Sequence, residues 1–233
     1  MNFFSTLRTL ALACCGLVFS AQAFAVSSTT TYGFVGVGDP SANATNVATG
    51  ISSLRVEVID FGVAPSGYSQ VAFKFTNAST SSLTDVYFDD GTLLGIASIS
   101  DSGNTVSFSE GAKPANLPGG NNLALDFNTT KGFSADSNPP ISPNGVTSGE
   151  WLTIIFDLQS GKNYQSVISA MSLPNGGGAG DLRIGLHVQS FANGGSASFV
   201  NVATPVPEAN TYAMMLAGLG LLGFTVMRRR AHS

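Results

Sequence analysis

The sequence predicts an all-β protein, and two features of residues 26–205 carry that prediction. Apolar and polar side chains alternate there with the two-residue period of a half-buried strand. Clusters of Gly, Asn, Ser and Pro separate the alternating segments and mark turns. About seven to nine strands with turn signals between them are typical of an antiparallel β-sandwich, Ig-like or jelly-roll in topology.

The strands are expected where the alternation is clearest. The five strongest candidates are Leu54–Phe61, Val71–Asn77, Asn122–Asn128, Trp151–Leu158 and Asp181–Val188. Shorter strands are expected at Val86–Phe88, Thr105–Phe108 and Ser198–Val202, a short helix at Tyr164–Ser172, and a long loop capping one end around Ser134–Thr147. We see no internal repeat, so residues 26–205 are predicted to form one ectodomain.

Residues 1–25 have the composition of a secretory signal peptide. Arg8 supplies the positive n-region, and Thr9–Phe19 forms a mostly apolar h-region that is short for an uncleaved membrane anchor. One A-x-A cleavage site ends at Ala23 and a second ends at Ala25. We expect cleavage after Ala25.

Both cysteines, Cys14 and Cys15, lie inside this signal. The residues before them do not fit the pattern of a lipoprotein acylation site, so lipidation is not expected. The mature chain therefore contains no cysteine, which excludes thiol catalysis, thiolate zinc sites and iron–sulfur clusters. Because residues 26–205 number 180, they can bury a core without disulfides.

Charge is distributed unevenly along the chain. Residues 26–205 hold six basic and thirteen acidic residues, a formal charge of −7, whereas the whole chain carries −4. The remaining basic residues lie in the two targeting ends. A domain this acidic does not bind nucleic acid by neutralising phosphates, whereas solubility and cation binding fit it better.

The C-terminal 28 residues begin with a short motif and contain an apolar span with a basic end. Ala209–Met227 is a run of nineteen uncharged residues. As a helix it would reach ~28 Å, close to the ~30 Å hydrocarbon core of a bilayer. Arg228, Arg229 and Arg230 then form a cationic stop that the positive-inside rule places in the cytoplasm. A GxGxxG match inside the span lacks the strand and helix that a dinucleotide site requires.

This tail resembles the PEP-CTERM protein-sorting signal of Gram-negative bacteria that make exopolysaccharide. The motif Val206-Pro207-Glu208, the single span and the terminal arginines carry the resemblance, although Ala209 replaces the usual second proline. The resemblance implies an exosortase partner, a membrane thiol transpeptidase that cuts near the motif. It also implies an inner-membrane stage with the ectodomain in the periplasm, followed by release to the cell surface or matrix.

The best metal candidate is an acidic cluster of Asp85, Asp89 and Asp90. Closely spaced carboxylates in a turn can supply several of the roughly six to eight oxygen ligands of calcium. The spacing lacks the EF-hand frame, and Asp89-Asp90-Gly91 fits an ordinary turn equally well. Asp136 is a weaker candidate. No firm metal ligand is assigned, and calcium is the one cofactor considered.

Residue types suited to catalysis are sparse. His187 is expected to face outward from its strand, and no G-x-S-x-G elbow accompanies it. Glu150 and Asp157 are the carboxylates considered for polysaccharide hydrolysis, which requires a pair ~5–10 Å apart across a cleft. Trp151 suits a sugar-stacking platform, although a tryptophan at a strand start is also typical of a core or rim.

We therefore expect a non-enzymatic exported protein of the cell surface or exopolysaccharide matrix, tethered by residues 206–233 until an exosortase processes it. A carbohydrate- or calcium-binding module is the alternative. A secreted polysaccharide hydrolase is less favoured, and the lack of a regular Thr-x-Thr ladder argues against ice binding.

Overall fold

The computed structural model describes residues 27–38, 43–103, 105–173, 181–205 and 219. Within these residues the chain is mostly β-strand, arranged in two antiparallel sheets, as the sequence predicts. None of the described helices has the length and hydropathy needed to cross a bilayer. The signal peptide and, apart from Leu219, the span predicted at Ala209–Met227 lie outside the described residues.

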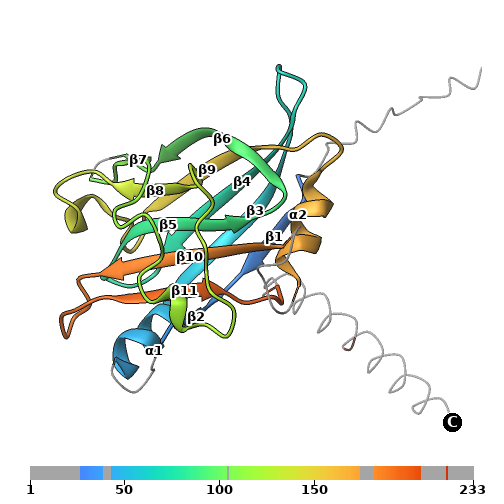
Figure 1. The fold of residues 1–233 in the computed structure, drawn as a ribbon. Coiled ribbons are helices and arrows are strands. Elements are labelled where there is room, and N and C mark those ends of the chain that lie inside the picture. The colour runs from blue at the N-terminus through green and yellow to red at the C-terminus, as the bar shows by residue number, and fades with distance from the viewer. Residues whose placement is uncertain (1–26, 39–42, 104, 174–180, 206–218, 220–233) are drawn as a thin grey trace, which may run out of the picture.

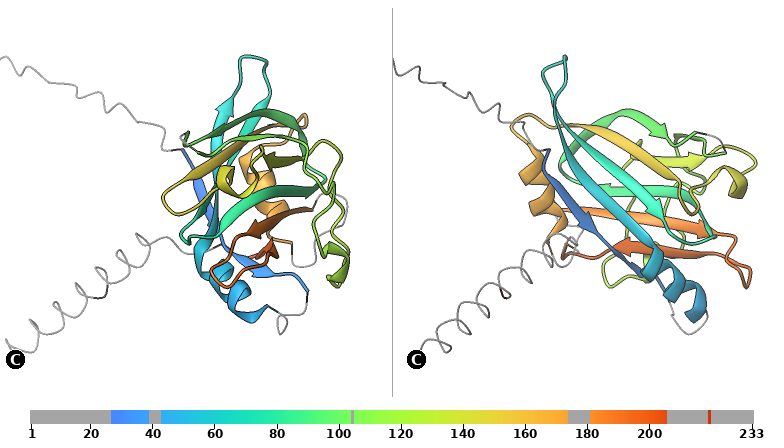
Figure 2. Two further views of the ribbon diagram at one scale, coloured as in Figure 1. Left: turned by 90° about the vertical axis from the view of Figure 1, so that its left-hand side faces the viewer. Right: turned by 180° about the vertical axis from the view of Figure 1, so that it is seen from behind.

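The two sheets stack face to face around one core (Figure 1, Figure 2). The five-stranded sheet has, in spatial order, β1 (Thr29–Tyr32), β3 (Leu54–Val63), β4 (Ser69–Asn77), β9 (Trp151–Leu158) and β6 (Leu93–Asp101). The six-stranded sheet has β2 (Phe34–Gly36), β11 (Ala197–Asn201), β10 (Leu182–Gln189), β5 (Ser82–Asp90), β8 (Ser134–Ser137) and β7 (Phe108–Glu110). Consecutive strands are sheet neighbours only at β3–β4, β7–β8 and β10–β11, so the chain otherwise passes from one sheet to the other.

Four short helical segments join these strands: α1 (Ala44–Ser53), α2 (Tyr164–Met171) and the 3₁₀ turns η1 (Gly120–Asn122) and η2 (Ser142–Asn144). The α2 helix confirms the predicted short helix. It begins with a capping box, in which Ser166 N donates to Asn163 Oδ1 at 3.0 Å and Asn163 N donates to Ser166 Oγ at 3.3 Å. Its apolar face packs against β10, β3 and β4.

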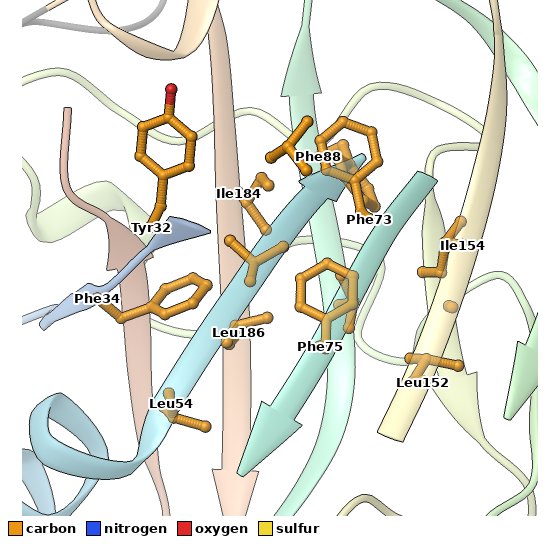
Figure 3. Packing of buried hydrophobic residues seen from close by; sticks show 14 of the residues in the cluster. Tyr32, Phe34, Leu54, Phe73, Phe75, Phe88, Leu152, Ile154, Ile184 and Leu186 are labelled. Atoms are coloured by element: carbon orange, nitrogen blue, oxygen red, sulfur yellow. The ribbon is translucent and has the colours of Figure 1, made fainter. Parts of the chain in front are cut away.

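The predicted alternation places the core correctly in four strands. The inward side chains of β3, β4, β9 and β10 are fully or almost fully buried, and they include Leu54, Phe73, Phe75, Leu152, Ile154, Ile184 and Leu186 (Figure 3). At the centre, the Phe88 ring lies 5.1 Å from Phe73 and 4.7 Å from Phe156 in edge-to-face geometry. Such pairs add about 0.5–1.5 kcal/mol each beyond their burial, so this cluster holds the two sheets together.

The strand predicted at Asn122–Asn128 is wrong. After η1 the chain is irregular, and of the three alternating apolar residues only Phe127 is buried. This stretch belongs to the covering segment (residues 111–130), which crosses the outer face of the six-stranded sheet (Figure 1). Phe127 packs there with Tyr87 and Leu117. The alternation therefore reflects a loop packed on a sheet, not a strand within one.

Other predicted boundaries are corrected in the same sheet. The loop expected at Ser134–Thr147 contains β8 and η2, and β5 extends well beyond Val86–Phe88. The strand expected at Thr105–Phe108 overlaps β7 only at Phe108. The structure also adds α1, β1, β2 and β6. Because seven consecutive residues of β5 are buried, covered on both faces, the two-residue alternation is lost there.

Candidate functional site

The outer face of the five-stranded sheet carries a shallow groove beside Trp151. This Trp151 groove encloses about 520 Å³, and its walls include Arg55, Lys74, Thr76, Ser148, Glu150 and Trp151. Strand register brings them together, because Thr76 on β4 pairs with Arg55 on β3 and with Trp151 on β9. The groove thus places a half-buried indole beside cationic and hydroxyl groups, a combination suited to a polyhydroxylated ligand.

Charges in the Trp151 groove are held in place by local contacts. Lys74 Nζ lies 3.7 Å from Glu57 Oε2, its cross-strand neighbour. Arg55 Nη1 donates to the carbonyl oxygens of Ile51 at 3.0 Å and Leu54 at 2.6 Å. Both cations therefore keep further N–H donors that can point into the groove.

Glu150 is fixed as an acceptor at the rim of this groove. Its Oε2 accepts from Thr147 N at 2.8 Å and Thr147 Oγ1 at 2.7 Å, and its Oε1 accepts from Thr105 Oγ1 at 3.0 Å. Partial burial alone would raise the pKa of Glu150, but the hydrogen bonds from Thr147 and Thr105 outweigh it and lower that pKa. A carboxyl with a lowered pKa is poorly suited to donate a proton.

The second carboxyl considered for hydrolysis lies elsewhere on the sheet. Asp157 is near the opposite end of β9 from Glu150, where its Oδ1 accepts from Gln70 Nε2 at 2.8 Å. Seven residue steps along the extended chain place the Cα atoms of Glu150 and Asp157 roughly 23 Å apart, far beyond the ~5–10 Å between the carboxyls of a glycosidase pair. Glu150 and Asp157 therefore do not form one catalytic site.

The three aspartates considered for calcium lie in different surroundings. Asp90 caps a turn, accepting from Thr92 N at 2.7 Å and Leu93 N at 2.7 Å. Asp89 forms an ion pair with Arg183, and Asp85 lies beside Asp136 on β8. In the described part of the chain, no three Asp, Glu, His or Cys side chains gather as metal ligands. The turn interpretation thus fits Asp90.

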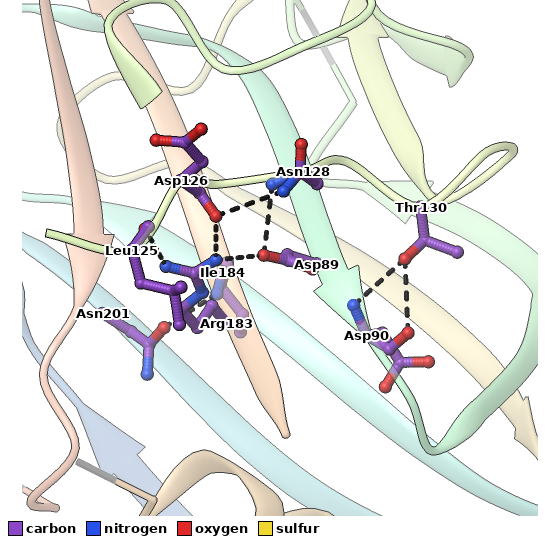
Figure 4. A network of polar contacts seen from close by, with 9 residues as sticks. All are labelled: Asp89, Asp90, Leu125, Asp126, Asn128, Thr130, Arg183, Ile184 and Asn201. Carbon is purple, nitrogen blue, oxygen red and sulfur yellow. Dashed lines mark hydrogen bonds and ion pairs between the residues drawn. The ribbon is translucent and has the colours of Figure 1, made fainter. Parts of the chain in front are cut away.

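Arg183, which the sequence did not single out, ties the covering segment to the sheet (Figure 4). Its guanidinium pairs with Asp89 on the neighbouring strand β5 and donates to the carbonyl oxygens of Leu125 at 2.8 Å and Asp126 at 2.5 Å. It also lies 5.2 Å from the centroid of the Phe127 ring. The sequence signal that could have identified Arg183 is its position as the one basic residue of its predicted strand in an acidic domain.

A polar row crosses the six-stranded sheet beneath that segment. Register aligns Ser198 on β11, His187 on β10, Asp85 on β5 and Asp136 on β8. His187 Nδ1 lies 3.1 Å from Ser198 Oγ, and burial lowers the pKa of His187, which favours the neutral ring. Ser198 is only 7% exposed, so its hydroxyl is not presented to a substrate. Within this row Ser198 and Asp85 are buried, whereas His187 and Asp136 are partly exposed.

Asp85 is the least exposed carboxyl of that row, at 2%. Its Oδ2 accepts from Thr84 Oγ1 at 2.8 Å, while its buried Oδ1 has no hydrogen-bond donor among the described residues. Burial, and then the adjacent Asp136 carboxylate, raise the pKa of Asp85 from 3.8 to about 7, against the lowering effect of the Thr84 hydrogen bond. Asp85 therefore keeps its proton to a higher pH than an exposed aspartate does.

The β-sandwich leads directly into the C-terminal tail. Its last strand, β11, ends at Asn201, and the described chain continues to Pro205. The family model for the PEP-CTERM protein-sorting motif matches residues 205–230.

The chain carries a PEP-CTERM protein-sorting motif. The match includes Val206-Pro207-Glu208 and all three terminal arginines, and Ala209 in place of the second proline does not prevent it. PEP-CTERM sorting implies export, a membrane-associated stage and processing by an exosortase. No curated protein and no solved structure matches the chain. The motif residues, the arginines and the predicted cleavage sites at Ala23 and Ala25 lie outside the described residues.

Proposed function

We propose that this chain is a non-catalytic protein of the cell surface or exopolysaccharide matrix. A signal peptide ending at Ala25 directs export, and the tail anchors the chain in the inner membrane with its ectodomain in the periplasm. An exosortase then processes the chain near Val206-Pro207-Glu208. The observation that supports this proposal most is the PEP-CTERM match at residues 205–230, which directly follows a folded β-sandwich.

The tether is tested by deleting Ala209–Ser233 and fractionating the cells. The deletion should move the protein from the membrane fraction to the soluble periplasmic or secreted fraction. In a host that lacks its exosortase, the full chain should instead accumulate as a membrane-bound precursor. Mass spectrometry of the native protein locates both cleavage sites, and a mature mass that still includes the tail would contradict the processing step.

Two observations support a non-catalytic ectodomain over the hydrolase alternative. The Glu150 and Asp157 carboxyls are too far apart to act together, and Ser198 beside His187 is buried. The purified protein should therefore leave its host's exopolysaccharide at full length. A hydrolytic activity that disappears in Glu150→Gln or Asp157→Asn would overturn this part of the proposal.

Carbohydrate binding at the Trp151 groove is the second candidate function. It is favoured by the half-buried indole, which register places beside Thr76 and Arg55 in an open groove. Replacing Trp151 with Ala should weaken binding to the host's exopolysaccharide by about two- to tenfold, since an aromatic stacking contact contributes roughly 0.5–1.5 kcal/mol. The matched control is Phe61→Ala, which removes an exposed ring outside the groove. Equal losses in both variants would rule out a specific site.

Calcium binding ranks behind carbohydrate binding because Asp85, Asp89 and Asp90 have different partners. A calcium titration followed by thermal unfolding decides it, because a ligand that binds the native state raises the melting temperature. We expect no rise at millimolar calcium. A rise that Asp89→Asn or Asp90→Asn abolishes would restore calcium as a cofactor.

A further inference from the structure

A second groove lies where the chain leaves the ectodomain toward its tail. This exit groove encloses about 580 Å³, and its walls include Val35 on β2, Leu125 of the covering segment, and Val202 and Ala203 just after β11. Its floor includes Val200 and Leu182, which are buried. It is open to solvent on the six-stranded side of the sandwich, away from the Trp151 groove.

The rim of the exit groove is apolar and solvent-exposed. Val35, Leu125 and Leu173 are 42%, 44% and 46% exposed, although each is large enough to be expected in a core. Single exposed apolar residues are ordinary, but several around one hollow mark an interaction surface. Because the floor residues already pack within the fold, the apolar surface that remains exposed to solvent lies at the rim.

The position of the exit groove identifies what can reach it. Ala203 forms part of the wall, and the PEP-CTERM match begins two residues later. Glu208 is the fifth residue after Ala203, so the Pro-Glu motif lies at most ~17 Å along an extended chain from the groove. An enzyme whose catalytic centre engages that motif therefore comes within contact range of Val35 and Leu125.

Charge favours an enzyme over the bilayer itself. Arg183 is the one charged residue among the described residues lining the groove, and Asp89 already neutralises it. Attraction to an anionic lipid surface depends on clusters of free Lys and Arg, which this lining lacks. The net charge of −7 on residues 26–205 adds repulsion.

We propose that the exit groove is a docking surface for the exosortase, which inserts an apolar segment between Val35 and Leu125 while it engages the sorting motif. This inference rests on the proposed function, because it requires exosortase processing. Docking raises the local concentration of the motif at the catalytic centre. The rate of processing then depends on the ectodomain as well as on the tail.

The test uses the full chain in its exosortase-positive host and follows conversion of precursor to processed protein by pulse-chase. Val35→Asp and Leu125→Asp should each slow processing about five- to tenfold, the range expected when an anchor residue of an interface is lost. Val63→Asp is the matched control, because Val63 is 70% exposed at the end of β3 and does not line the groove. Its processing should keep the wild-type rate.

A photocrosslinking residue placed at position 125 of the full chain identifies the occupant directly. We expect an adduct with the exosortase at position 125 and none at position 63. Adducts with lipid alone, or wild-type processing rates in both groove variants, would overturn the docking proposal while leaving exosortase processing intact. A wild-type chain that is never processed would instead overturn the proposed function itself. Unchanged melting temperatures of the variants exclude misfolding as the cause of slow processing.

Discussion

The outer faces of the two sheets differ in how far other parts of the chain cover them. The six-stranded sheet is crossed on its outer side by residues 111–130, whose Leu117 and Phe127 pack with Tyr87. The five-stranded sheet leaves Arg55, Lys74 and Trp151 partly exposed around an open groove. Polar residues are therefore present on both outer faces, but those around the Trp151 groove are not covered by a crossing segment.

This difference separates structural polar groups from groups available for binding. On the covered face, Arg183 and Asp89 are largely shielded from solvent, with side-chain exposures of 11% and 15%. On the open face, the corresponding pair, Lys74 and Glu57, has exposures of 36% and 40%. An ion pair on the covered face stabilises the fold, whereas the pair on the open face leaves its charges free to meet a ligand.

The largest expected effect comes from uncovering the six-stranded sheet. Phe127→Ala removes a ring that packs against Tyr87 and Leu117, and it should lower the free energy of unfolding by about 3 kcal/mol. Trp151→Ala on the open face should cost about 1 kcal/mol or less, because that ring is only half-buried. Urea denaturation of the processed protein measures both. Similar losses in the two variants would contradict the distinction between the faces.

Breaking the ion pair on the covered face should also cost more stability than breaking the pair on the open face, but the difference should be smaller than for the two aromatic residues. Arg183→Met leaves Asp89 without its cation and frees the carbonyls of Leu125 and Asp126, so we expect a loss of about 2–3 kcal/mol. Lys74→Met should change stability by less than about 1 kcal/mol, as for most exposed pairs. Denaturation in low and high salt checks the assignment, since only the exposed pair should be sensitive to screening.

The same difference explains which strands were predictable from the sequence. In β3, β4 and β9 one face is buried and the other is more exposed, so the two-residue alternation located all three nearly to their ends. In β5 both faces are buried, and only its central residues were recognised. The residues 122–128 alternate just as clearly, yet they form a loop, because periodicity reports burial and not strand pairing.

The candidate sites also differ in how far the sequence alone could predict them. The sorting motif was predictable because its parts follow one another in the chain, and the family match confirms it. Trp151 was recognised, but Arg55 and Thr76 join it only through the pairing of β3, β4 and β9. The contact between Asp85 and Asp136 likewise depends on the register of β5 against β8, which no local pattern specifies.

The smallest expected effect is a pH dependence of opposite sign on the two faces. The pKa of Asp85 is raised to about 7 in the fold, so the native state holds a proton that the unfolded chain releases above its ordinary value of 3.8. The stabilisation that Asp85 contributes is therefore complete below pH 3.8 and is lost as the pH rises toward 7. Because Asp136 lies beside Asp85 and titrates together with it, we expect a loss of about 1–2 kcal/mol across this window.

Glu150 on the open face should act in the other direction. Its pKa is lowered, so its contribution is present above the ordinary pKa of 4.5 and is lost as the pH falls through the lowered value. Denaturation of the wild-type protein, Asp85→Asn and Glu150→Gln between pH 3 and 8 separates the two groups. Asp85→Asn should remove the decline toward pH 7, whereas Glu150→Gln should leave that decline in place and remove only part of the loss at the acid end. A decline toward pH 7 that persists in Asp85→Asn would show that the raised pKa of Asp85 is not its cause.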